Sequence, residues 1–182
     1  GSLASVMRFL RNSKEEYVVM ADCHVVGSND YDALVEEHVA TGADITIAYK
    51  HGAVPDMPDT LLLWTDKDKR VSDIVLGTHP AGEGDYGLGL YVMRRDLLQQ
   101  LVSTCLGRNY RHFERDILQR HVENMRIYGY EVPERTMVIS SLVSYFEANM
   151  AMLKPEVRAD LFNSGRPVYT KVRDCPPALY GL

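Results

Sequence analysis

The chain has 182 residues, of which 46% are hydrophobic and 25% charged, and its net charge is −5. These values are typical of one soluble globular domain, and the interspersed acids and bases form no basic stripe that would favour nucleic acid or an anionic membrane surface. We expect no membrane span and no signal peptide. The three cysteines, Cys23, Cys105 and Cys175, are too few and too scattered for a disulfide framework. They therefore predict a protein of the reducing cytoplasm.

Apolar periodicity near the start of the chain predicts an amphipathic helix that leads into a strand, then a second helix and a second strand. The strand, Tyr17–Ala21, is a continuous apolar run of the kind that is buried on both faces of a sheet. Asn29 or Asp30 caps the second helix, which Gly42 ends. The β-branched run 44–49 completes a strand–helix–strand unit, which implies parallel neighbours joined by a right-handed crossover.

The rest of the pattern adds a hairpin and further alternating elements. The expected strands are 60–65, 70–76, 87–93 and 125–132, and the expected helices are 94–106, 113–124 and 140–153. We therefore predict an α/β fold with a mixed, mostly parallel sheet and helices on both faces. Residues 1–2 are interpreted as a tag remnant, 3–162 as one domain, and the proline-containing segment 163–182 as an exit linker.

A lone acid, Asp22, follows the first predicted strand. Ligands of open α/β sheets bind at the carboxyl ends of strands, where a carboxylate is well placed to hold a divalent metal against a phosphate. The alternative interpretation is an aspartate that merely ends a strand or begins a turn. Asp22-Cys23-His24 also resembles the D-x-D triplet of nucleotide-sugar enzymes, although a histidine replaces the second acid and Mg²⁺ prefers oxygen ligands.

Other candidate motifs are weaker. Residues 82–87 spell G-x-G-x-x-G, but this motif follows a loop and opens a strand, so we interpret it as a flexible loop and not as a dinucleotide site. The six histidines have no zinc spacing, and His38 and His121 are predicted to lie on solvated helix faces. Cys23 is predicted to be a small buried hydrophobe. No nucleophile elbow supports a hydrolytic triad.

Several segments are similar to the bacterial ADP-glucose pyrophosphorylases, also called glucose-1-phosphate adenylyltransferases. The resemblance covers nearly the whole chain and is carried by residues 17–22, 30–31, 42–47, 112–118, 145–150, 166–170 and 176–178. It implies a nucleotide-diphospho-sugar transferase fold of the GT-A, Rossmann-like type, of which this chain is an incomplete internal segment. It also implies that the linker 163–182 leads to a left-handed β-helix. In that family, glucose 1-phosphate attacks the α-phosphorus of ATP and two acids hold Mg²⁺.

The same resemblance implies that the catalytic groups are degenerate in this chain. Asp22 falls on the family's first metal acid, but Val138 occupies the position of the second, and Gly87 that of a serine. No lysine follows the hairpin, where the family has E-K-P, and the family's glycine-rich triphosphate loop lies outside the chain. This pattern resembles the non-catalytic GlgD-type subunits. We expect a vestigial metal acid at Asp22, no catalytic residue, and no cofactor in this segment, although the family uses Mg²⁺.

The sequence leaves three functions open. The first is a regulatory subunit that associates with a catalytic glucose-1-phosphate adenylyltransferase subunit in glycogen synthesis. The second is an active sugar-phosphate nucleotidyltransferase in which Glu83 or Asp85 supplies the second metal acid. The third is a module that binds a sugar phosphate or nucleotide sugar without chemistry. Because an incomplete sheet has exposed edges, we also expect the chain to self-associate.

Overall fold

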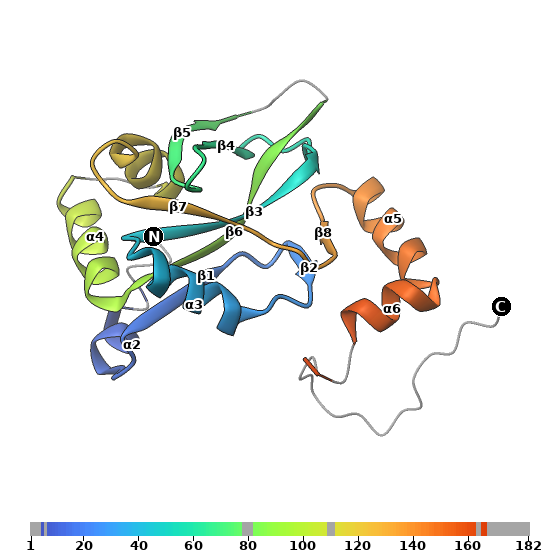
Figure 1. Ribbon diagram of the computed structural model, residues 1–182, viewed down its shortest axis with the longest axis horizontal. Helices are drawn as coiled ribbons and strands as arrows, with labels where there is room; N and C mark the ends of the chain where they lie inside the picture. Colours follow the sequence, from blue (N-terminus) through green and yellow to red (C-terminus); the bar gives the residue numbers. More distant parts are fainter. Residues whose placement is uncertain (1–4, 6, 78–81, 109–111, 163–164, 167–182) are drawn as a thin grey trace. The chain divides into compact units, whose positions relative to one another are not determined.

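The chain forms two compact units in the computed structural model, which describes residues 5, 7–77, 82–108, 112–162 and 165–166 (Figure 1). The first unit comprises Gly1–Cys23 and Tyr31–Val132, and the second comprises His24–Asp30 and Pro133–Leu182. Most of the predicted linker 163–182 lies outside the described residues. Among the residues that are described, no helix is long and apolar enough to cross a membrane.

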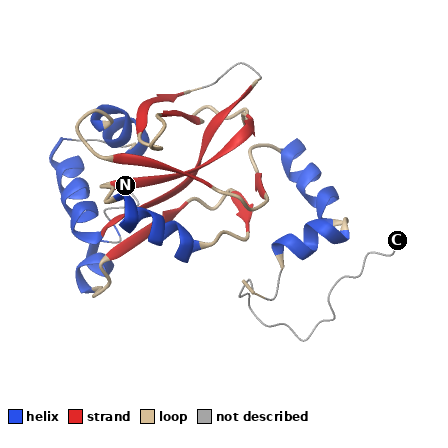
Figure 2. Cartoon of the chain, in the orientation of Figure 1, coloured by secondary structure: helices blue, strands red, loops and turns tan. Residues whose placement is uncertain are grey.

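A six-stranded sheet organises the first unit (Figure 2). Its main path runs β5-β4-β6-β3-β7, and β1 pairs with β6 beside this path. The strands are β1 (Tyr17–Ala21), β3 (Ile45–Ala53), β4 (Leu61–Thr65), β5 (Val71–Leu76), β6 (Glu83–Arg94) and β7 (Ile127–Glu131). The hairpin predicted at 60–76 is confirmed as the antiparallel pair β4–β5.

The α/β class is confirmed, but the expectation of a mostly parallel sheet is wrong. Only β3 and β7 pair in parallel among the described strands, whereas β1, β3 and β4 all pair antiparallel with β6. The predicted strand–helix–strand unit exists, and β1 and β3 run in the same direction. They are not direct neighbours, however, because β6 lies between them and pairs with both.

The position of β1 also differs from the prediction. A strand buried on both faces was expected, but no residue of Tyr17–Ala21 is fully buried, and Val19 is 37% exposed. The reason is that β6 is the only described strand that pairs with β1, whereas β3 has a partner on each side. β1 is therefore an edge strand.

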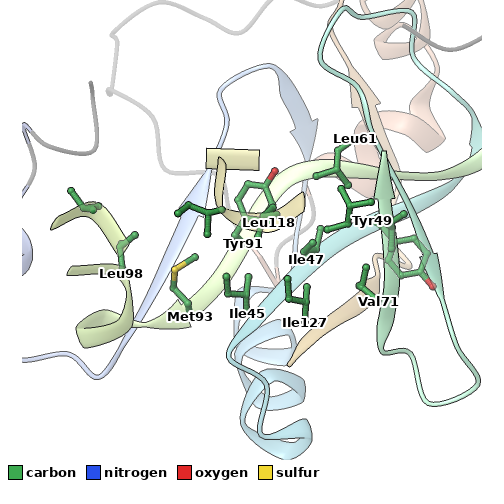
Figure 3. Close-up of a cluster of buried hydrophobic side chains, with 14 of the residues drawn as sticks. Ile45, Ile47, Tyr49, Leu61, Val71, Tyr91, Met93, Leu98, Leu118 and Ile127 are labelled. Carbon is green, nitrogen blue, oxygen red and sulfur yellow. The ribbon is translucent and has the colours of Figure 1, made fainter. Parts of the chain in front are cut away.

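Helices cover both faces of the sheet, as predicted. They are α2 (Met7–Asn12), α3 (Tyr31–Thr41), α4 (Arg95–Arg108) and a π-helical turn, η1 (Glu114–Gln119). One face packs against α2, α4 and η1. Figure 3 shows this core, which contains Ile45, Ile47, Tyr49, Leu61, Val71, Tyr91, Met93, Leu98, Leu118 and Ile127. The intervening residues of β3 point to the other face, where α3 lies.

His38 joins α3 to the sheet, which corrects the prediction that it lies on a solvated face. It is 2% exposed, and its Nδ1 lies 2.7 Å from Thr46 Oγ1 on β3. The ring also contacts the Tyr17 ring edge-on, with the two centroids 5.5 Å apart. Leu34 and His38 are the buried residues of α3, whereas the apolar Val39 is 52% exposed. Burial lowers the pKa of His38, although the nearby Asp44 carboxylate opposes this shift.

The described residues of the second unit form a two-stranded antiparallel ribbon and two helices. Its elements are β2 (Val25–Gly27), β8 (Thr136–Val138), α5 (Leu142–Met152) and α6 (Pro155–Leu161). Ser141 caps α5, because its Oγ accepts from Ser144 N–H at 3.1 Å while Ser144 Oγ accepts from Ser141 N–H at 2.8 Å. The predicted helix 140–153 is confirmed, and the short strand β8 was not predicted.

The two histidines His38 and His51 should affect the pH dependence of stability in opposite directions. The folded pKa of His38 lies below its usual 6.5, so the unfolded chain binds more protons and stability falls as the pH decreases below about 6.5. A hydrogen bond to Asp85 raises the pKa of His51, so its contribution is present at low pH and is lost as the pH rises through the folded pKa. We expect His38→Gln to reduce the loss of stability on acidification, and His51→Gln to increase it.

Urea unfolding between about pH 5.5 and 7.5 measures both effects. His51→Gln is the comparison with the opposite expected sign, because it removes a histidine from an exposed position in the same unit. An unchanged pH dependence in His38→Gln would contradict the assignment of His38 as a buried neutral ring.

Candidate functional site

Asp22 lies immediately after β1, as predicted. Ala21 is the last residue of β1 that pairs with β6, where its partner is Leu90. The N–H of the next residue, Asp22, donates to the Gly89 carbonyl at 3.0 Å. The backbone of Asp22 is thus held by β6, while the residue itself is exposed. This places a carboxylate at the carboxyl end of a strand, the position at which α/β sheets bind ligands.

An irregularity in β6 makes room for this carboxylate. On β3, Ala48 pairs with Leu90 of β6, and the next residue, Tyr49, pairs with Gly87. Leu88 and Gly89 of β6 are therefore extra residues that form a bulge. Gly89 adopts φ +63°, and a Cβ added there would lie 2.2 Å from Asp22 Oδ2. The Asp22 side chain therefore lies against bare backbone, and only glycine fits opposite it.

A buried tyrosine lies close to the same bulge. Tyr91 is 3% exposed, its hydroxyl donates to Glu114 Oε1 at 3.2 Å, and its ring packs against Phe113 with a centroid separation of 5.3 Å. Burial raises the pKa of Tyr91 well above its usual value, and the charges of Glu114 and Asp22 raise it further. Tyr91 consequently stays protonated, and a field from two carboxylates acts on its hydroxyl.

The sequence did not predict that Glu114 lies beside Tyr91 and close to the bulge. It lies in the segment 112–118, noted only for its family-like pattern, and was predicted within an ordinary helix. The structure instead begins a π-helical turn at Glu114. π-Helical turns occur often at functional sites, but no single-sequence signal distinguishes them from α-helix.

Gly87, which occupies the family's serine position, is close to the hairpin. A Cβ at Gly87 would lie 3.1 Å from Leu61 Cδ2, which is tighter than ordinary van der Waals contact. Leu61 is 4% exposed and belongs to the core. A serine at this position would require Leu61 to move.

The acids proposed as alternative metal ligands, Glu83 and Asp85, are in strand β6. The expectation of a flexible loop over 82–87 is therefore wrong from Glu83 onward, because these residues pair with β3. Asp85 accepts a hydrogen bond from His51 Nδ1 at 2.7 Å. Asp22 is beside Gly89, which follows Asp85 by four residues and Glu83 by six, beyond the bulge in β6. A metal role for Glu83 or Asp85 stays a prediction. Among the described residues, no group of three or more His, Cys, Asp or Glu side chains is arranged to hold a metal.

Val138, the position of the expected second metal acid, is in the second unit. It is the last residue of β8 and pairs with Val25 of β2, and the next residue, Ile139, donates its N–H to the His24 carbonyl at 2.8 Å. A valine side chain has no atom that can coordinate a cation.

Cys23, predicted to be buried, is exposed.

The chain is similar in sequence to a glycogen biosynthesis protein and to several glucose-1-phosphate adenylyltransferases. The chain is 21% identical over 173 residues to the glycogen biosynthesis protein GlgD of Bacillus subtilis, covering 95% of this chain and 40% of that protein. It is 23% identical to a glucose-1-phosphate adenylyltransferase of Thermosipho melanesiensis, with 96% and 43% covered, and 25% identical to one of Thermotoga maritima, with 94% and 42% covered. No family model matches the chain.

A solved structure supports the same fold. HddC from Yersinia pseudotuberculosis matches with a TM-score of 0.59 at 17% sequence identity, covering 81% of this chain and 60% of that one. The fold is thus of the nucleotide-diphospho-sugar transferase type. By sequence, the chain is a relative of the glucose-1-phosphate adenylyltransferases and of GlgD, and it spans less than half the length of these curated relatives.

Substitution of Gly89 should show how closely Asp22 and β6 are coupled. Gly42 has nearly the same φ, +62°, but an added Cβ would meet nothing closer than Arg126 Nη1 at 3.7 Å. We expect Gly42→Ala to cost about 1–2 kcal/mol from the left-handed backbone alone. Gly89→Ala adds a clash with Asp22 and should cost at least about 1 kcal/mol more.

The double variant Asp22→Gly with Gly89→Ala isolates this contact. Urea unfolding should show that the additional cost of Gly89→Ala disappears once the Asp22 side chain is removed. Equal costs for Gly42→Ala and Gly89→Ala would contradict the close approach.

Proposed function

We propose that this chain is part of a non-catalytic, regulatory subunit of the GlgD type, which associates with a catalytic glucose-1-phosphate adenylyltransferase in the cytoplasm and acts in glycogen synthesis. The observation that carries this proposal is Val138 on β8, at the position where the resemblance requires the second metal acid. Nucleotidyl transfer depends on a metal ion that is fixed by protein ligands while charge develops on phosphate oxygens. Asp22 alone leaves that ion poorly held and oriented.

A second position supports the same proposal. The family's serine is replaced by Gly87, and the space that its side chain would need is restricted by Leu61, a core residue. The loss of this hydroxyl is therefore accompanied by packing that disfavours its return. Packing of this kind fits a sheet that serves as a scaffold and does not carry out chemistry.

The arrangement at Asp22 favours a second candidate function, in which the same subunit binds a sugar phosphate or nucleotide sugar without turnover. The bulge and Gly89 hold Asp22 at the carboxyl end of β1 although its expected metal partner is missing. A carboxylate in this position can accept hydrogen bonds from sugar hydroxyls or share a hydrated Mg²⁺ with a phosphate. Mg²⁺-dependent binding of ADP-glucose, lost in Asp22→Ala, would support this function.

Pyrophosphate release from ATP and glucose 1-phosphate tests the main proposal. The full-length protein should give no turnover alone and should change the kcat or KM of a catalytic homologue when the two are mixed. Turnover by the protein alone, abolished by Asp22→Ala, would overturn the proposal and direct attention to Glu83 and Asp85 as metal ligands. The absence of any effect in the mixture would contradict the regulatory role.

A further inference from the structure

Helix α3 is attached to the sheet through two buried side chains among its 11 residues, Leu34 and His38. It packs against β3, β6 and β7. All of its residues are described, and none belongs to the hydrophobic core of Figure 3, whose members come from α2, α4, η1 and the strands. A helix with so few buried groups is the kind of element that opens locally while the rest of its unit stays folded.

The two buried side chains of α3 differ in their response to pH. Leu34 is apolar, so its packing does not depend on protonation. His38 lies with Nδ1 2.7 Å from Thr46 Oγ1, and its ring contacts the Tyr17 ring edge-on. A hydroxyl and an aromatic edge provide no counter-charge, so these partners suit a neutral imidazole and not a buried imidazolium.

The carboxylate nearest in charge to His38 is already engaged elsewhere. Asp44 favours the protonated form of His38, but less strongly than burial opposes it. Its Oδ1 accepts from Arg126 Nη2 at 2.9 Å, and its Oδ2 accepts from the Arg126 N–H at 2.8 Å. Because the guanidinium neutralises much of this negative charge, Asp44 compensates poorly for a proton on His38.

The other elements around α3 were considered in the same way. On β6, the residue that pairs with Thr46 is the apolar Val92, and on β7 it is Tyr128, which brings a phenol. On α3 itself, Glu37 forms an ion pair at 3.2 Å with Lys69, in the turn between β4 and β5. Both members of that pair are solvent-accessible, so water screens their effect on the buried ring.

We propose that α3 is a proton-sensitive cover of the sheet: protonation of His38 releases α3 locally, while the strands and the core on the other face stay folded. The released helix uncovers a face on which Thr46 and Ala48 of β3 pair with Val92 and Leu90 of β6. Each of these four residues is at most 3% exposed when α3 is in place. The inference rests on packing in the first unit and is independent of the proposed regulatory function.

The release also acts on β1. Tyr17, the first residue of this strand, loses its ring contact with His38. The strand is then held by its pairing with β6 and by the packing of Val18 and Met20 against the core. Because β1 leads directly to Asp22, proton uptake under α3 affects the strand that carries the candidate site.

Linkage gives the size and the sign of the expected effect. Burial lowers the pKa of His38 while α3 is in place, and the ring regains its usual pKa of 6.5 when α3 opens. The open form therefore binds more protons, so opening increases as the pH falls. If the covered ring stays neutral, the opening constant rises about 10-fold between about pH 7.5 and 5.5.

Amide hydrogen exchange of the 182-residue chain at these two pH values, corrected for the intrinsic exchange rates, tests the proposal. We expect the α3 amides to lose about 10-fold in protection at the lower pH, whereas the amides of 45–48 and 90–93 keep theirs. In His38→Gln the pH-dependent loss should disappear, because glutamine keeps a polar partner for Thr46 and does not titrate. The comparison variant His51→Gln, which removes an exposed histidine from β3, should retain the loss.

A second variant keeps the test decisive if His38→Gln does not fold. Leu34→Ala weakens the other buried contact of α3, so exchange should be faster at both pH values with the same ratio of about 10 between them. Equal protection of α3 at the two pH values in the unsubstituted chain would overturn the proposal. A parallel loss of protection in 45–48, which would mean global unfolding, would also overturn it, as would an unchanged pH dependence in His38→Gln.

Discussion

The first unit depends on the pairing of β6 on both of its edges. β3 pairs along nearly the whole of one edge, while β1 and β4 pair with the other, so one strand of 12 residues holds three others in place. Its inward residues Tyr91 and Met93 extend the core from β3 toward α4 and η1. The bulge at Leu88 and Gly89 interrupts this ladder at one point only, and Asp22 is attached there. The candidate site therefore exists because β6 departs locally from regular pairing.

Local signals in the sequence were sufficient for most individual elements. The hairpin β4–β5 is joined by a polar turn in which Asp66 Oδ1 accepts from the backbone N–H groups of Asp68 and Arg70, an arrangement that depends only on neighbouring residues. Strand direction is a different matter, because it depends on pairing between distant segments. β6 enters the sheet between β1 and β3 after about 30 further residues, and nothing within the strand–helix–strand unit indicates this insertion.

Histidine burial shows a second limit of the sequence pattern. The face of α3 that packs on the sheet carries Leu34 and His38, whereas the apolar Val39 is exposed. His38 can occupy a core position because Thr46 supplies a partner for its Nδ1 and the Tyr17 ring covers its edge. Both partners come from strands that the helix reaches only after folding. A hydropathy pattern treats histidine as polar and cannot anticipate such compensation.

The same reasoning separates the parts of the candidate site that sequence could predict from those it could not. Asp22 was found because the end of an apolar run is a local signal, but its dependence on Gly89 requires two strands to meet. Under the proposed regulatory role, Val138 and Gly89 are also under different structural constraints. A valine at 138 suits a β-strand, so the loss of a metal acid there carries no penalty for the fold. Gly89 has no such freedom, because any side chain would collide with Asp22 in a left-handed backbone conformation. Under this proposal, a catalytic group is lost at Val138, where a strand accepts the change, while the bulge in β6 that holds Asp22 is kept.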